Sequence, residues 1–234
     1  QAAENQFFGK PCGLRDQMTS SVGSFVEIDF ADPANPVIEK LDFDFASCGY
    51  ALCIVDTGGS HSDLTDEYAA VRKEMESVAE YLGKSVLREV DEDEFMKNIA
   101  DIRSSCGDRA VLRAMHFYGD NARVEKQAAA LKAGDFETFK KYIIESGRSS
   151  YMYNQNVYSC KKASEQPVSL ALSLSEKLLD GCGAWRVHGG GFAGTIQAFV
   201  PLNKLDEYKD LMEKVFGSGS CYILSVRPVG GVEL

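Results

Sequence analysis

The chain has 234 residues, of which 44% are hydrophobic and 26% are charged, and its formal net charge is −10. This composition is typical of a globular protein that buries a core in one large domain or two small ones. The negative charge argues against binding along a nucleic-acid backbone or an anionic membrane, but it is compatible with a local positive pocket for a phosphate.

The cysteines and histidines argue against a metal site built by the protein. The cysteines are odd in number, scattered and without a Cys-x-x-Cys pair, which predicts reduced thiols in a cytoplasmic protein. No histidine belongs to a His-Glu-x-x-His pattern. The residues are Cys12, Cys48, Cys53, Cys106, Cys160, Cys182 and Cys221, with His61, His116 and His188.

The first part of the chain predicts a short helix and three strands. A helix is expected to begin near Asp16, after Pro11 has ended an earlier one. Alternating apolar residues at 24–30 predict a strand, and 37–41 returns as its hairpin partner. The continuous apolar run at 50–55 is typical of a buried strand.

Helices are expected to dominate the middle of the chain. Apolar residues recur at spacings of three and four over 63–82, and further helices are predicted at 92–102, 109–132, 136–146 and 168–179. Asp135 is a candidate cap for the fourth of these five helices. The stretch 147–166 predicts irregular structure.

The last part predicts strands at 184–187 and 195–200, a helix at 203–216 and a strand at 222–226. This order, with helices upstream, predicts an α+β fold in which helices cover one side of an open sheet.

A glycine-rich turn connects the strands at 184–187 and 195–200. The run Gly189-Gly190-Gly191 is followed by Gly194, so that four glycines fall within six positions. Glycine accepts positive φ and carries no Cβ, which allows backbone amides to approach an anion such as phosphate. The alternative is a tight turn that uses glycine for backbone shape alone.

Three segments together resemble the galactokinases of the GHMP small-molecule kinase family. They are the Cys-Gly-x-x-Asp-Gln segment at 12–17, the Gly-Gly-Gly-Phe-x-Gly segment at 189–194, and the segment 58–68 that ends in an acidic residue and a tyrosine. They occur in the family's order across nearly the whole chain.

The resemblance implies a fold, a domain division and a chemistry. It implies a GHMP-kinase-like α+β fold, with residues 1–57 as a remnant of the amino-terminal domain and 58–234 as a ferredoxin-like carboxyl-terminal domain. It also implies a cytoplasmic enzyme that transfers a phosphoryl group from ATP, with Mg²⁺, to the C1 hydroxyl of galactose. The implied residues are Asp16 as catalytic base, Gly13 and Tyr68 at the sugar, and Gly189, Gly190 and Gly191 near the phosphates.

Ordinary structural roles remain open for two of these residues. Asp16 also fits a helix cap, and Tyr68 also fits a core aromatic residue with its hydroxyl at the edge. The chain departs from the family pattern at Arg15, where methionine is usual, and at His188, where threonine is common.

Several parts of the family pattern are missing from the sequence. There is no Gly-Leu-Ser-Ser-Ser-Ala loop to hold the triphosphate, no Gly-Glu-His-x-Asp-Tyr signature, and no arginine expected to pair with the base. We therefore expect a carboxyl-terminal fragment that is inactive alone. The alternatives are a non-catalytic galactose sensor and a kinase for another sugar.

Overall fold

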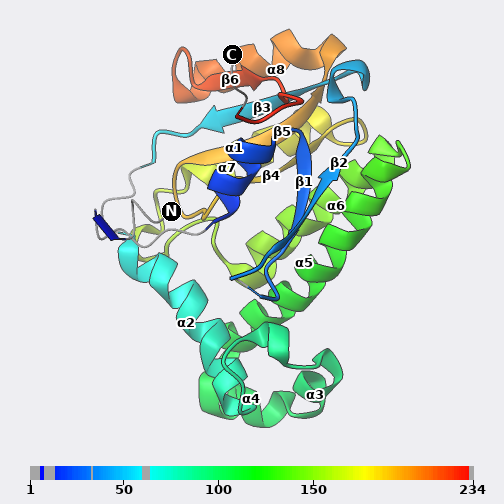
Figure 1. Cartoon of the computed structure of the whole chain (residues 1–234). Coiled ribbons are helices and arrows are strands. Elements are labelled where there is room, and N and C mark those ends of the chain that lie inside the picture. Colours follow the sequence, from blue (N-terminus) through cyan, green and yellow to red (C-terminus); the bar gives the residue numbers. More distant parts are fainter. Residues whose placement is uncertain (1–5, 8–13, 33, 60–63, 232–234) are drawn as a thin grey trace.

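The computed structural model describes residues 6–7, 14–32, 34–59 and 64–231 (Figure 1). The helices in this part of the chain are α1 (Arg15–Val22), α2 (Thr65–Tyr81), α3 (Glu92–Lys97), α4 (Ile99–Cys106), α5 (Asp108–Lys132), α6 (Phe136–Ser149), α7 (Pro167–Leu179) and α8 (Leu205–Phe216). The strands are β1 (Phe25–Asp29), β2 (Val37–Leu41), β3 (Tyr50–Asp56), β4 (Ala184–Val187), β5 (Thr195–Pro201) and β6 (Cys221–Leu224).

The predicted strands and most of the predicted helices are confirmed, with two differences. The helix expected at 92–102 is two helices that meet at Asn98. Helix α6 continues beyond the expected end at 146, and a π-helical turn at Ser150–Asn154 follows it. Gly147 lies inside α6 and does not end it. Its lack of a side chain lets α6 lie against β4, since a Cβ at this position would come within 2.9 Å of the Arg186 Cβ.

A four-stranded antiparallel sheet in the order β4-β5-β3-β6 forms the centre of the molecule. Strand β3 pairs with β5 on one side, where Val55 lies opposite Ile196, and with β6 on the other. Strand β3 ends just before residue 57, so the sheet combines strands from both sides of the domain boundary predicted there.

Helices cover both faces of this sheet, so the expected one-sided layout is wrong. On one face α7 and α8 pack against the strands, and Trp185, Tyr208 and Met212 belong to that core. On the other face α5 and α6 pack with the β1–β2 hairpin around an aromatic cluster that includes Phe136 and Phe199, whose ring centroids are 5.7 Å apart. Strand β5 supplies buried residues to both cores, since consecutive residues point to opposite faces.

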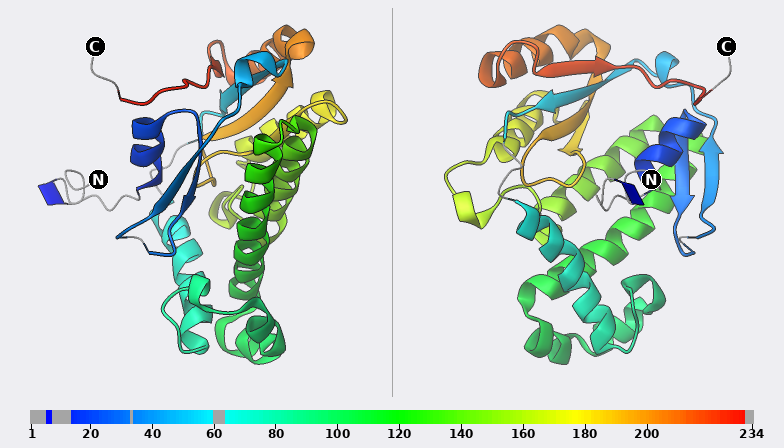
Figure 2. Two further views of the ribbon diagram at one scale, coloured as in Figure 1. Left: turned by 45° about the vertical axis from the view of Figure 1, so that its right-hand side comes forward. Right: turned by 60° about the vertical axis from the view of Figure 1, so that its left-hand side comes forward.

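Helices α2 to α4 and α8 lie at opposite ends of the molecule, as Figures 1 and 2 both show. No helix in the described part of the chain combines the length and apolar character needed to cross a membrane. A separate apolar core that includes Val78, Phe95 and Ile102 holds α2, α4 and the start of α5 together.

The end of the chain fastens α1 and the hairpin to the rest of the molecule. The N–H of Ser24 donates to the Arg227 carbonyl at 2.7 Å, and the N–H of Gly231 donates to the Ser21 carbonyl at 3.3 Å. Lys40 Nζ also donates to the Pro228 carbonyl at 2.7 Å. These contacts determine where α1, and therefore Asp16, lies.

Candidate functional site

The loop between β4 and β5, residues 188–194, forms a turn with an unusual backbone. Gly189, Gly191 and Gly194 have φ values of 68°, 80° and 85°, and Phe192 has a φ of 57°. A positive φ is unfavourable for residues with a Cβ, so a phenylalanine in this region needs support from its surroundings. We call residues 188–194 the glycine turn.

Three segments that are distant in sequence supply that support. The Tyr68 hydroxyl donates to the Gly191 carbonyl at 2.8 Å, and its ring packs edge-to-face on Phe192. The Asn156 side-chain amide donates to the Gly190 carbonyl at 3.1 Å, while the Asn156 carbonyl accepts from the Phe192 N–H at 2.5 Å. The Thr57 hydroxyl donates to the Gly194 carbonyl at 2.6 Å. The glycine turn is therefore held from α2, from the loop after α6 and from the end of β3.

A buried ionic network holds the segment that carries Asn156. The Arg113 side chain has no exposed surface; its Nε donates to the Asn154 carbonyl at 3.0 Å and its Nη1 pairs with Glu74 at 2.8 Å. The Ser159 hydroxyl donates to the buried Glu67 carboxylate at 2.8 Å. No pattern in the sequence points to Asn156 or Arg113. A polar residue in an irregular stretch, and an arginine on an amphipathic helix, carry no local signal of burial.

The outer side of the glycine turn presents free hydrogen-bond donors. Gly189 and Gly190 are exposed, and their N–H groups donate to no acceptor in the described residues. Adjacent unpaired backbone N–H groups form a concave site that favours an anion.

Charged side chains lie near His188, the first residue of the glycine turn. Burial lowers the pKa of His188, the charges of Arg15 and Arg186 lower it further, and the Asp16 carboxylate opposes them. The His188 Nδ1 lies 2.9 Å from the Thr195 hydroxyl. His188, which precedes Gly189 and Gly190, therefore lies near charges of both signs.

Asp16 lies in the first turn of α1. Its carboxylate is 84% exposed and lies 3.3 Å from the Arg15 Nε. The capping alternative for Asp16 is wrong, because Leu14 precedes α1 as its N-cap and no side chain caps the helix within the described residues. Asp16 is close enough to His188 for its charge to influence the pKa of that residue, while the predicted sugar residue Gly13 lies outside the described residues.

The structure shows Tyr68 as a core aromatic residue with its hydroxyl at the edge, and its role at the sugar stays a prediction. The side chain is half-buried, burial raises the pKa of its hydroxyl, and the ring belongs to a small apolar core with Leu64 and Phe192. Its hydroxyl lies at the edge of this core, where it contacts the glycine turn. A Cβ on Gly190 would come within 2.8 Å of the Tyr68 ring, so the absence of a side chain there permits this packing.

Replacing Tyr68 with phenylalanine is expected to reduce the free energy of unfolding by about 1 kcal/mol, the usual net value of one neutral hydrogen bond. The ring and its packing are kept, so the loss isolates the bond to Gly191. Urea denaturation would measure it. Tyr81→Phe, at an exposed tyrosine at the end of the same helix, is the matched control and should leave the stability unchanged.

The unfolding free energy is expected to decrease as the pH falls below the ordinary histidine pKa of 6.5, in part because of His188. A histidine whose pKa is lower in the folded state binds its proton more tightly when unfolded, so acid favours unfolding down to the folded-state pKa. Above 6.5 this contribution to stability is fully present. Denaturation at a series of pH values should show a smaller decrease for His188→Asn; an identical decrease would contradict the assignment.

Residues that could hold a metal ion do not gather in the described part of the chain, where no group of three or more His, Cys, Asp or Glu side chains is found. Beside the glycine turn, a cavity of about 660 Å³ is lined by residues from the end of β3, the start of α7 and the turn, including Thr57, Ser159, Gln166 and Phe192. This volume falls within the range of about 300–1,000 Å³ common for small-molecule sites.

Comparisons with known proteins show which proteins the chain is similar to. No protein-family model matches the chain. Over its entire length the chain is 30% identical to the galactokinase of Homo sapiens, of which it covers 56%. It is 27% identical over 212 residues to the galactokinase of Actinobacillus pleuropneumoniae serotype 5b, a match that covers 91% of this chain and 52% of that protein. The chain thus spans about half the length of the curated relatives that it matches.

The fold is similar to a solved structure as well. The crystal structure of Lactococcus lactis galactokinase complexed with galactose matches with a TM-score of 0.73 and 21% identity, and the match covers 100% of this chain and 59% of that one.

Proposed function

We propose that this chain, a galactokinase homologue that corresponds to the carboxyl-terminal portion of those proteins, supplies part of a site for ATP-dependent phosphorylation of galactose at its C1 hydroxyl. The observation that carries the proposal is that the unpaired N–H groups of Gly189 and Gly190 directly follow His188, a residue close enough to the Asp16 carboxylate for that charge to influence its pKa. The complete site needs the rest of a longer chain.

In this proposal Asp16 is the catalytic base. Phosphoryl transfer to a sugar needs a group that accepts or orients the hydroxyl proton, and an exposed carboxylate on a fixed helix suits that role. Asp16 can accept this proton only as a carboxylate. Gly13 and Tyr68 remain proposed sugar-side residues.

The glycine turn is the proposed phosphate-side element. In the proposal the unpaired N–H groups of Gly189 and Gly190 donate to phosphate oxygens, while the Gly191 carbonyl accepts from the Tyr68 hydroxyl and so holds the turn. ATP supplies the phosphoryl group that is transferred. The proposal gives these residues no role in binding Mg²⁺, since the described residues contain no cluster of three or more His, Cys, Asp or Glu side chains.

The domain division and the location in the cell are also proposals. We propose residues 1–57 as the end of an amino-terminal domain and 58–234 as the carboxyl-terminal domain, although β3 joins the sheet of the latter. The odd, unpaired set of cysteines supports a cytoplasmic location.

The test compares this chain with the same chain extended upstream to its start codon. Calorimetric titration with galactose and with Mg-ATP, followed by a single-turnover assay, should show binding and galactose 1-phosphate for the extended chain alone. Product from the isolated chain would contradict its expected inactivity. Galactose binding without ATP consumption in the extended chain would favour a sensor, and turnover of a different sugar would change the substrate.

A further inference from the structure

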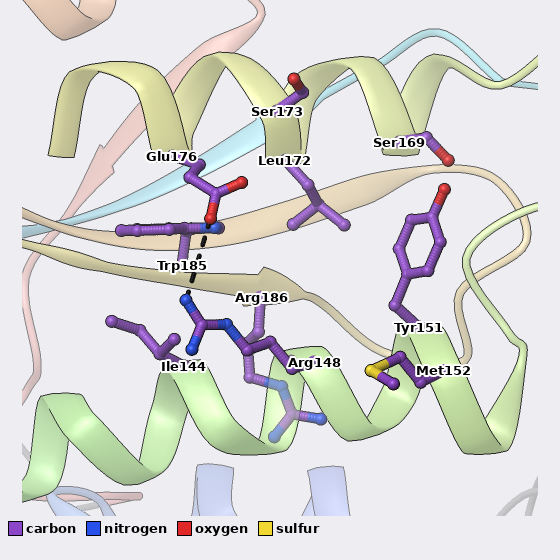
Figure 3. Close-up of a pocket in the computed structure, with 11 residues that line it drawn as sticks. Ile144, Arg148, Tyr151, Met152, Ser169, Leu172, Ser173, Glu176, Trp185 and Arg186 are labelled. Carbon is purple, nitrogen blue, oxygen red and sulfur yellow. Dashed lines mark ion pairs between the residues drawn. The ribbon is translucent and has the colours of Figure 1, made fainter. Parts of the chain in front are cut away.

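A second pocket lies apart from the glycine turn, between α6 with its π-helical extension, α7 and β4 (Figure 3). Its volume is about 390 Å³, which suits a small ligand. Trp185 from β4, Leu172 from α7 and Ile144 from α6 supply apolar walls, and Tyr151 and Met152 close one end. Figure 3 shows Leu172 pointing into the space between the helices.

Several polar atoms that face this pocket lack partners. The Ser169 hydroxyl is buried and makes no hydrogen bond within the described residues. Trp185 is 7% exposed, and its indole N–H donates to no acceptor there. In Figure 3 the hydroxyls of Ser169 and Tyr151 point toward each other across the pocket. A buried hydroxyl without a partner costs free energy, which a bound molecule with matching polar atoms would recover.

Three charged residues line the pocket, but in Figure 3 the Arg186 side chain extends away from α7, which leaves Arg148 and Glu176 to face a ligand. The Arg148 Nη2 and the Glu176 carboxylate are 3.8 Å apart, and both side chains are more than half exposed. Because their charges offset each other, they select neither an anion nor a cation. The indole N–H requires an acceptor on the ligand, whereas the Ser169 and Tyr151 hydroxyls can donate or accept.

We propose that this pocket binds an uncharged heteroaromatic ring compound of about the size of a nucleobase. The flat faces of such a ring would pack between Trp185 and Leu172, and its ring nitrogens or carbonyl groups would reach the Trp185 N–H and the Ser169 hydroxyl. A sugar fits less well, because the lining is mostly apolar. The proposal does not depend on the proposed kinase role, since Asp16 and the glycine turn do not line this pocket.

The tryptophan fluorescence of the chain reports on this pocket directly, because Trp185 is the only tryptophan in the sequence. Titration with adenine, monitored by tryptophan fluorescence of the whole chain, is expected to give a saturable change in emission, and galactose is expected to give none. Ser169→Ala should weaken adenine binding about three- to tenfold, the effect of one hydrogen bond, without reducing stability. Leu172→Phe, which fills the pocket with a larger apolar side chain, should abolish the change.

The matched control is Ser105→Ala, at an exposed serine of α4, which should bind adenine as the unaltered chain does. Circular dichroism would establish that each variant is folded. Three outcomes would overturn the proposal: no saturable change with adenine, an equal change in Leu172→Phe, or a response to galactose in place of adenine. A Ser169→Ala chain that binds adenine with unchanged affinity would also count against it.

Discussion

Replacing Asp16 with asparagine in the upstream-extended chain is expected to lower the rate of galactose phosphorylation by about 10²–10⁴-fold, the usual contribution of a general base. Asparagine keeps the shape of the side chain but cannot accept the hydroxyl proton. The free energy of unfolding should change by no more than about 0.5 kcal/mol, because the Asp16 carboxylate is 84% exposed and its ion pair with Arg15 lies at the surface.

The measurements are a single-turnover assay with labelled ATP and urea denaturation of the same preparations. Asp210→Asn is the matched control, since Asp210 is an exposed aspartate of α8, far from the glycine turn in the fold (Figure 1). A variant with normal turnover would exclude Asp16 as the base. A variant that unfolds would instead assign Asp16 a structural role, contrary to its exposure.

Replacing Gly191 with alanine is expected to destabilise the chain by about 2–5 kcal/mol. This sum combines about 1–2 kcal/mol for a Cβ at positive φ with about 1–3 kcal/mol for overpacking. The φ of Gly191 is 80°, and a Cβ there would overlap the Asn156 carbonyl oxygen. Since that oxygen also accepts from the Phe192 N–H, relief of the overlap must displace the contact that holds the turn.

Gly189→Ala separates the backbone strain from the steric overlap. Gly189 has a similar φ of 68°, but a Cβ there would meet nothing within 4 Å, so only the strain of about 1–2 kcal/mol is expected. Urea denaturation of both variants measures the difference. Equal losses at the two positions would show that Asn156 does not restrict the turn.

Local sequence patterns were sufficient for much of the site. The glycine run predicted a turn between two strands. The Cys-Gly-x-x-Asp-Gln segment marked Asp16 as the candidate base through its resemblance to the galactokinases. Apolar periodicity located most of the helices, because burial of one helix face imposes a spacing that is visible within a single segment. These features depend on residues that are close together in the chain.

The sequence by itself determined the element types, the turn and the candidate base, whereas only the tertiary structure decided what holds them in place. Tyr68 and Gly191 are 123 positions apart, and Asn156 and Gly190 are 34 apart. Gly147 looked like a break in a helix, yet it permits the contact between α6 and β4. Helices cover both faces of the sheet because α5 and α6 pack on the face opposite α7 and α8. Such contacts arise from packing between distant segments, for which one sequence contains no local pattern.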